Sequence, residues 1–351
     1  MPTTTPLQSL DFSPALLDAP PRVCVIAEIG VNHDGNVQIA RELIAAAVQA
    51  GADAVKLQHF CPERLLSNQA LLAEYQQTAA QSQQDLLSRL ALPLDQLRGL
   101  AGLAEQVGLA MIVTPFSLDD VRDLASINLQ AVKIASPDAV NTPLLEAAAG
   151  LNKPLIVSTG TCTLDELAPA ASILAGHAPG GAMLHCVSSY PTPPEHAGLS
   201  GIAQLAGRFS LTVGYSDHTA LEHTGALAVA AGAVILEKHL TYDRQAAGPD
   251  HAASLEPQGL ARYIKQVRQA QAMLGPQRRD CEGIEADVRR VSRQSLCARK
   301  TLPAGHILGP EDLTLKRPGT GIPASKLPDL LGRTLSRQIM ENDLIHYPDV
   351  T

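Results

Sequence analysis

Short apolar runs that alternate with longer helical segments are the feature that most limits how this chain can fold. Eight such runs occur, and they are Val23–Ile29, Asp53–Gln58, Ala110–Val113, Ala131–Ala135, Pro154–Ser158, Ala182–Cys186, Leu211–Tyr215 and Ala233–Lys238. A helical pattern follows each run, and this alternation is typical of βαβ units with a parallel sheet. Eight units in succession predict a closed (β/α)8 TIM barrel rather than an open doubly wound sheet.

Turn signals and a change of composition divide the chain further. Gly51, Gly108 and Gly232 each lie after a predicted helix and before a predicted strand, where a helix end favours a left-handed residue. Around residues 275–290 the βα pattern gives way to a charged, mixed segment. We therefore predict a leader over 1–21, a barrel over 22–276, a linker over 277–290 and a small, mostly β domain over 291–351.

The overall composition excludes several classes of protein. No apolar run is long enough to span a bilayer, and residues 1–21 lack the basic and apolar regions of a secretory signal. The six cysteines form no CxxC pair, so we expect reduced thiols in a cytoplasmic protein. The net charge of −8 argues against a nucleic-acid surface. We therefore expect neither membrane nor nucleic acid as a partner.

Polar or charged side chains stand at or near the carboxyl end of every predicted strand. A (β/α)8 barrel brings these ends to one face, where the active sites of this fold lie. Any single residue of this kind could be a paired core residue, but eight coincident cases favour a functional site. The residues from which we argue its chemistry are Glu28, Lys56, Lys133, Ser136, Asp138, Ser158, Ser216, His218, His239 and Asp250.

The residue types indicate what the site binds. Two lysines among serine hydroxyls suit a small anion such as a phosphate with a nearby carboxylate. His218 and His239 lie on neighbouring strand ends and could bind a metal with open coordination positions, although two structural histidines bonded to backbone fit the spacing equally. The carboxylates of Glu28, Asp138 and Asp250 could bind sugar hydroxyls or move protons. Glu237 could orient a ligand or pair with a lysine.

Specific motifs then connect the chain to a known family. They include AEIGVNHDG (27–35), KIAS (133–136), VGYSDHT (213–219), EKHLTYDR (237–244) and GPDHAASLEP (248–257). In this order and spacing they make the chain resemble the sialic acid synthase family over about residues 23–348. The tail motifs LPAGHIL and RPGTGI resemble the antifreeze-like (SAF) domain that ends these enzymes.

The resemblance implies an activity and a set of roles. It implies condensation of phosphoenolpyruvate with an open-chain N-acyl hexosamine, typically N-acetylmannosamine, to a nine-carbon 2-keto acid with release of phosphate. It implies a divalent metal, with manganese first and magnesium or cobalt as alternatives, on His218 and His239. The phosphoenolpyruvate pocket implied is Lys56, Thr114, Lys133, Ser136, Ser158 and Ser216. The implied acceptor contacts are Glu28, Tyr190 and Asp250, joined by Arg317 of the lid domain from the partner subunit of a domain-swapped homodimer. Asp138 stands where the family glutamate approaches the metal-bound water and the substrate. Glu28, Lys56, Lys133, Asp138 and the two histidines are the expected catalytic residues.

One departure leaves the acceptor open. After KIAS the family usually has Gly-Glu, whereas this chain has Pro137–Asp138, so the carboxylate is one methylene shorter on a stiffer backbone. A synthase of the same type for a different aldose, including a phosphorylated one, is therefore an alternative, although it would need more cations in the sugar half. A non-catalytic sugar-binding homologue is a second alternative, which the retained lysines and histidines disfavour.

Overall fold

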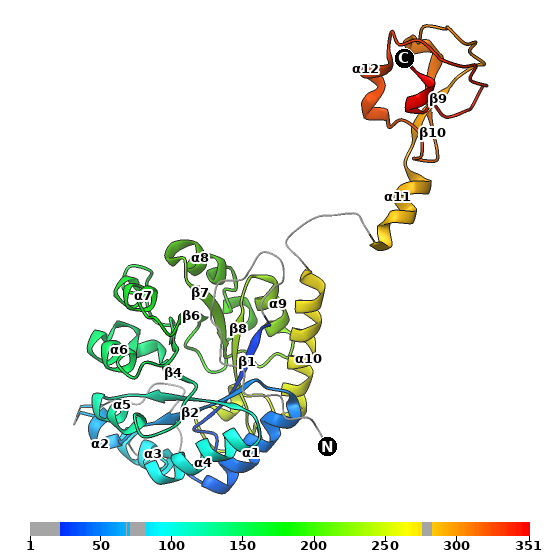
Figure 1. Ribbon diagram of the computed structural model, residues 1–351. Coiled ribbons are helices and arrows are strands. Elements are labelled where there is room, and N and C mark those ends of the chain that lie inside the picture. The colour runs from blue at the N-terminus through cyan, green and yellow to red at the C-terminus, as the bar shows by residue number, and fades with distance from the viewer. Residues whose placement is uncertain (1–21, 68, 71–81, 276–282) are drawn as a thin grey trace. The chain divides into compact units, whose positions relative to one another are not determined.

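The computed structural model describes residues 22–67, 69–70, 82–275 and 283–351. The chain divides into two compact units, Met1–Gln277 and Arg278–Thr351. In the first unit eight parallel strands close into a barrel, each hydrogen-bonded to its neighbours in chain order (Figure 1). They are β1 (Cys24–Gly30), β2 (Ala54–His59), β3 (Ala110–Pro115), β4 (Ala131–Ile134), β5 (Leu155–Ser158), β6 (Gly181–Cys186), β7 (Thr212–Asp217) and β8 (Ile235–His239). The predicted fold class is confirmed, and each strand bound lies within two residues of its prediction.

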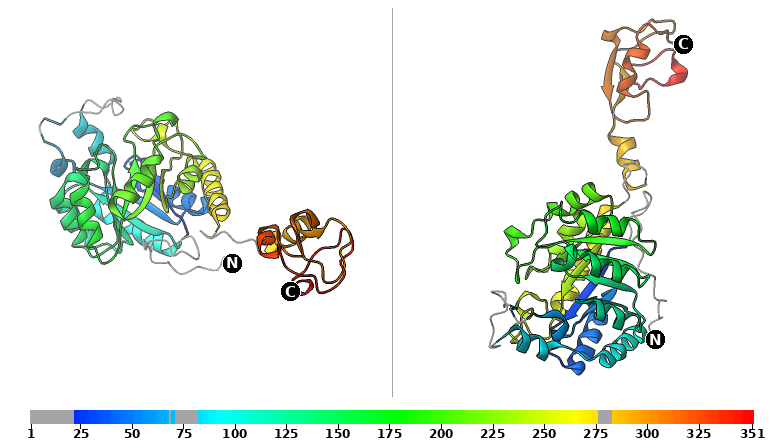
Figure 2. Two further views of the ribbon diagram at one scale, coloured as in Figure 1. Left: turned by 90° about the horizontal axis from the view of Figure 1, so that it is seen from above. Right: turned by 90° about the vertical axis from the view of Figure 1, so that its left-hand side faces the viewer.

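Helices surround the strands, as the two further views show (Figure 2). They are α1 (Val37–Ala50), α2 (Pro62–Leu65), α3 (Gln83–Leu90), α4 (Leu94–Gln106), α5 (Leu118–Leu124), α6 (Thr142–Ala149), α7 (Ala168–Ala175), α8 (Ser200–Phe209), α9 (Thr224–Ala230) and α10 (Pro257–Leu274). The predicted left-handed glycines are confirmed at Gly51, Gly108 and Gly232, with φ of 85°, 78° and 106°. Gly51 closes α1, and its N–H donates to carbonyls of the last turn. No described helix has both the length and the hydrophobicity of a membrane span.

The strands alternate between residues that point into the barrel and residues that point outward to the helices. Near the amino ends the inward positions are small or aliphatic, and they form one buried layer: Ile26, Ala54, Ala110, Ile112, Ala131, Ile156, Ala182, Leu184 and Ile235. Two residues further along β1, β2, β4 and β8 the inward positions are charged, namely Glu28, Lys56, Lys133 and Glu237. The aliphatic layer thus forms the barrel floor, and charged side chains lie directly above it.

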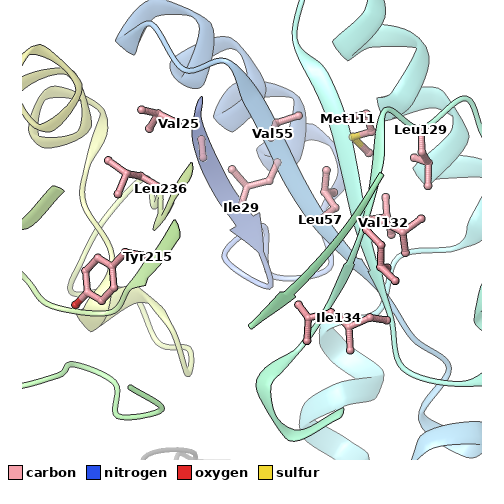
Figure 3. Close-up of a cluster of buried hydrophobic side chains, with 14 of the residues drawn as sticks. Val25, Ile29, Val55, Leu57, Met111, Leu129, Val132, Ile134, Tyr215 and Leu236 are labelled. Atoms are coloured by element: carbon pink, nitrogen blue, oxygen red, sulfur yellow. The ribbon is translucent and has the colours of Figure 1, made fainter. Parts of the chain in front are cut away.

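The outward positions pack against the helices in a larger aliphatic core. Val55 and Leu57 of β2, Met111 of β3, and Val132 and Ile134 of β4 belong to this core, as Figure 3 shows. All five are fully buried. A barrel held by such packing keeps the strand ends rigid, which is what a preorganised site needs.

The second unit has its own core and a short antiparallel pair, β9 (Ser295–Ala298) and β10 (Leu313–Lys316). It also contains α11 (Ala286–Ser292) and α12 (Leu327–Leu330). Two short 3-10 turns in it are capped in the same way, since Asp312 accepts from Gly309 N and Asp349 accepts from His346 N. The predicted mostly β character of this part of the chain is therefore confirmed.

Candidate functional site

A cavity of about 770 Å³ lies at the carboxyl ends of the barrel strands. Twelve of the thirteen residues that the sequence assigned to the site belong to the barrel unit, and eleven of these line the cavity: Lys56, Thr114, Lys133, Ser136, Asp138, Ser158, Tyr190, Ser216, His218, His239 and Asp250. The twelfth, Glu28, lies beneath it and contacts Lys56. The barrel therefore gathers side chains from seven strand ends into one space, although their individual roles stay predictions.

Four charged side chains form a continuous chain across the cavity floor. Lys56 Nζ lies 2.9 Å from Glu28 Oε2 and 3.4 Å from Glu237 Oε1, while Lys133 Nζ lies 3.6 Å from Glu237 Oε2. All four side chains are at most 6% exposed. Of the two interpretations left open for Glu237, pairing with a lysine is thus what the structure shows, and it pairs with both.

The two glutamates differ in their electrostatic surroundings. Burial raises the pKa of Glu28 to about 7, against the opposing influence of Lys56. Burial also acts on Glu237, but Lys133 and Lys56 prevail and lower its pKa to about 2. Lys56 is desolvated, yet Glu237 and Glu28 raise its pKa, whereas burial lowers the pKa of Lys133. Near neutral pH, Glu28 can therefore gain or lose a proton while Glu237 stays ionised, a separation typical of acid–base sites.

Hydroxyl groups surround the lysines. Ser216 Oγ donates to Glu237 Oε1 over 3.0 Å, and Lys56 Nζ donates to Thr114 Oγ1 over 3.4 Å. Ser136 Oγ accepts from Gly160 N over 3.0 Å. The buried Ser158 Oγ has no hydrogen-bond partner within the described part of the chain. An unsatisfied buried hydroxyl in a cavity that also contains two ammonium groups is what an anion site requires before its ligand binds.

The histidine pair fits a divalent cation. The ring centroids of His218 and His239 are 5.3 Å apart. His218 Nδ1 lies 2.8 Å from Val187 O, and because a carbonyl only accepts, Nδ1 carries the proton and Nε2 is left as the acceptor. Burial lowers the pKa of His239 well below its usual value, which keeps the imidazole neutral. Its Nδ1 makes no hydrogen bond to any described residue, the nearest carboxylate being Asp250 Oδ2 at 3.6 Å.

Asp250 and Tyr190 lie beside the histidines, and Asp138 lines the same cavity. Burial raises the pKa of Asp250 and that of Asp138, which accepts from Asn141 Nδ2 over 3.1 Å. The ring of Tyr190 lies 4.0 Å from that of His218, centroid to centroid. We call Asp138, Tyr190 and Asp250 the acidic half of the residues that line the cavity, and Lys56 with Lys133 the cationic half.

Sequence reasoning missed an apolar wall on one side of the cavity. We define the apolar wall as Val31, Phe60, Leu65, Leu86, Leu90 and Phe116, all of which line the cavity. Phe60 and Phe116, each just beyond the end of a strand, meet edge to face with centroids 5.9 Å apart. The sequence reasoning relied on polar residues at strand ends, so apolar residues at the same positions did not stand out. In a chain with 3% aromatic residues, however, two phenylalanines at adjacent strand ends were a detectable sign.

Cys186 also contacts site residues, although the sequence indicated only an ordinary reduced thiol at this position. Its Sγ lies 3.8 Å from His218 Nδ1 and accepts from Ser136 Oγ over 3.4 Å. Burial opposes ionisation, but His218, Ser136 and Lys133 lower the pKa of this thiol to about 7. In return Cys186 and the Val187 carbonyl raise the pKa of His218 despite its burial. The thiol therefore lies directly beside His218.

Another group of ligand-type side chains, His59, Asp120 and Asp123, lies close enough together to hold one ion. A guanidinium already lies among them, since Arg64 Nη1 is 3.1 Å from Asp120 Oδ1 and 2.8 Å from Asp123 Oδ2. His59 Nε2 is 3.2 Å from Asp123 Oδ2. We interpret this group as an ion-pair network that attaches α2 to α5, because the arginine supplies the positive charge that a metal would bring.

Arg317, the remaining predicted site residue, belongs to the second unit and is exposed there. Its predicted role as an acceptor contact from the partner subunit therefore stays a prediction.

The chain is similar to known proteins over most of its length. The sequence model of the NeuB family matches residues 43–279, and that of the SAF domain matches residues 293–351. An N,N'-diacetyllegionaminic acid synthase of Campylobacter jejuni is 38% identical over 92% of this chain and 99% of its own. The human N-acetylneuraminate-9-phosphate synthase is 31% identical over 92% and 90%. A crystal structure of the N-acetylneuraminic acid synthetase of Leptospira borgpetersenii, bound to citrate, superposes with a TM-score of 0.70 at 32% identity, covering 76% and 90%.

The fold and the site thus define a TIM-barrel protein with two buried lysines and a histidine pair in one cavity at the carboxyl ends of its strands. The matched models and relatives place the chain more narrowly: it belongs to the NeuB family and ends in a SAF domain.

Proposed function

We propose that the chain condenses phosphoenolpyruvate with an open-chain N-acyl hexosamine to a nine-carbon 2-keto acid and releases phosphate. In this reaction C3 of phosphoenolpyruvate bonds to the aldehyde carbon, water adds to C2, and the C2–O bond to phosphate breaks. The observation that carries the proposal is one cavity that is lined both by two buried lysines, Lys56 and Lys133, and by His218 and His239.

The cationic half suits phosphoenolpyruvate. Among the described residues, the ammonium groups of Lys56 and Lys133 pair only with the carboxylates of Glu28 and Glu237, so their remaining N–H groups can donate to a phosphate or carboxylate. The free Ser158 hydroxyl adds a donor. Glu237 keeps the lysines extended and charged, and Glu28, with its pKa near neutrality, is placed to accept or return a proton.

We propose His218 and His239 as the ligands of a divalent metal, with manganese first. When bound, this metal would act as a Lewis acid on the acceptor aldehyde. The residues themselves contribute the orientation: the Val187 carbonyl fixes the tautomer of His218, and Asp250 stands 3.6 Å from His239 Nδ1. The test is manganese binding without substrates, which we expect for the wild-type protein and not for His218→Ala or His239→Ala.

The acidic half of the residues that line the cavity favours a neutral, acylated sugar as the acceptor. Its polar groups are Asp138, Tyr190 and Asp250, and the apolar wall faces the same space. Among the described residues, Lys56 and Lys133 are the only lysines or arginines that line the cavity, and we assign both to phosphoenolpyruvate, so no lysine or arginine is left for a phosphorylated acceptor. Acyl methyl groups would pack on the apolar wall. We therefore expect 2,4-diacetamido hexoses to be better acceptors than N-acetylmannosamine, and unacylated hexoses to be poor.

We also propose that the SAF domain serves as a lid and that the enzyme is a domain-swapped homodimer. The match of residues 293–351 to the SAF domain and the exposed position of Arg317 support this. Sedimentation equilibrium tests it, because a monomer at micromolar concentration would contradict the dimer.

A further inference from the structure

Two fully buried charges lie next in sequence to the two histidines. Asp217 precedes His218, Lys238 precedes His239, and Asp217 and Lys238 have 0% exposure. They are register partners in β7 and β8, and Lys238 Nζ lies 3.1 Å from Asp217 Oδ2. Because side chains alternate along a strand, His218 and His239 face the cavity while the ion pair faces the helices. The pair therefore joins the two strands directly behind the histidines.

Further contacts surround this ion pair. Asp217 Oδ1 accepts from Thr219 N over 2.9 Å and from Thr219 Oγ1 over 2.8 Å. Lys238 Nζ also donates to the carbonyl of Thr219 and lies 5.6 Å from the centroid of the Tyr263 ring on α10. In the sequence His218 thus lies between Asp217 and Thr219, which are hydrogen-bonded to each other. Both strand ends and α10 meet at this point.

Stability alone does not explain a buried ion pair here. The surrounding outer shell of the barrel is aliphatic, and well-packed apolar residues of similar volume usually replace such a pair without loss of stability. What the pair provides instead is a directional link of fixed length between two backbones. It stands at the register position immediately before His218 and His239, where any slip of one strand end would change the separation of the imidazoles.

We propose that the Asp217–Lys238 ion pair is a positioning device that sets the spacing of His218 and His239, and with it the affinity of the site for a divalent cation. The inference rests on the metal site of the proposed function and names the residues that preorganise it. Asp217 and Lys238 act through the histidines and touch neither cation nor substrate.

The test replaces the pair by apolar residues in the full-length protein, as Asp217→Leu with Lys238→Met. Manganese affinity is measured without substrates, from the electron paramagnetic resonance signal of free Mn²⁺. We expect the dissociation constant to rise about tenfold or more, with an unchanged or higher melting temperature. The matched control is Arg268→Met, which breaks an ion pair between α10 and Asp53 at the opposite end of the barrel and leaves Arg22 on Asp53. Its manganese affinity should equal that of the wild type.

A second variant covers the case in which the double substitution prevents folding. Asp217→Asn keeps the shape and can still accept from Thr219, so we expect a folded protein with weaker manganese binding and an altered line shape of bound Mn²⁺. A dissociation constant within twofold of wild type in the folded variants would overturn the inference. If the ion-pair variants still bind manganese and His218→Ala does not, only the positioning role is contradicted. If the wild-type protein does not bind manganese, the metal site itself is contradicted.

Discussion

The substitution Glu237→Gln tests the charge chain on the cavity floor most sharply. Glu237 accepts from Ser216 and pairs with Lys56 and Lys133, and its pKa falls from 4.5 to about 2. A depression of this size corresponds to roughly 3 kcal/mol of folding free energy at neutral pH. Glutamine keeps the shape and the hydrogen bond from Ser216 but removes the charge, and Lys133 then has no carboxylate within ion-pair distance among the described residues. We expect a loss of about 3 kcal/mol, or a melting temperature lower by about 8 °C.

The assay is urea or thermal unfolding followed by circular dichroism, because the chain contains no tryptophan for fluorescence. The folded pKa of Glu237 lies below its unfolded value, so its contribution is complete above pH 4.5 and is lost as pH falls toward 2. The control is Glu222→Gln, which breaks a surface pair with Arg262 and should cost at most about 0.5 kcal/mol. Equal stability of the wild type and Glu237→Gln at pH 7 would refute the reasoning, as would a difference that grows from pH 7 to pH 5.

Three further outcomes follow from the site. Burial raises the pKa of Glu28 from 4.5 to about 7, so its favourable contribution to the free energy of unfolding is complete below pH 4.5 and is lost as pH rises through 7. Glu28→Gln should abolish this part of the pH dependence of unfolding, and an unchanged profile would contradict the reasoning. Arg317→Ala should raise KM for the acceptor without changing KM for phosphoenolpyruvate, whereas the exposed control Arg333→Ala should change neither; equal acceptor KM values in both would rule out the lid contact. Asp138→Glu should shift relative kcat/KM among acylated acceptors with phosphoenolpyruvate affinity unchanged, and an unaltered acceptor ranking would show that this carboxylate does not select the sugar.

The fold was predictable because its signal is local and repeated. Each strand is a short apolar run, and residues such as Lys56 and Lys133 stand out because charge is costly at a buried strand position. The closed barrel then determines which strand ends meet, so the lysines and histidines fall in one cavity without knowledge of their contacts.

What escaped prediction depends on geometry between distant segments. The pairing of Glu237 with two lysines depends on how far along the barrel axis the inward-facing residues of three different strands, β2, β4 and β8, are placed. The apolar wall combines loop ends with α3, and the network of Arg64 with Asp120 joins helices far apart in sequence. The lysine pairing and the ion-pair network leave no unusual residue type at a fixed spacing, so the sequence alone could not favour them over ordinary packing. The apolar wall left one sign, Phe60 and Phe116 at adjacent strand ends, but this sign does not give the extent of the wall.

The central claim is condensation of phosphoenolpyruvate with an acylated amino sugar at this cavity. The most direct measurement incubates the full-length protein with Mn²⁺, phosphoenolpyruvate and, in turn, N-acetylmannosamine, a 2,4-diacetamido hexose and an unacylated hexose. Phosphate and the sugar acid are then quantified, the latter by mass spectrometry. We predict equimolar phosphate and nine-carbon 2-keto acid with an acylated acceptor, and neither product in EDTA. Phosphate without sugar acid, or no product with any acceptor despite bound phosphoenolpyruvate and manganese, would contradict the claim.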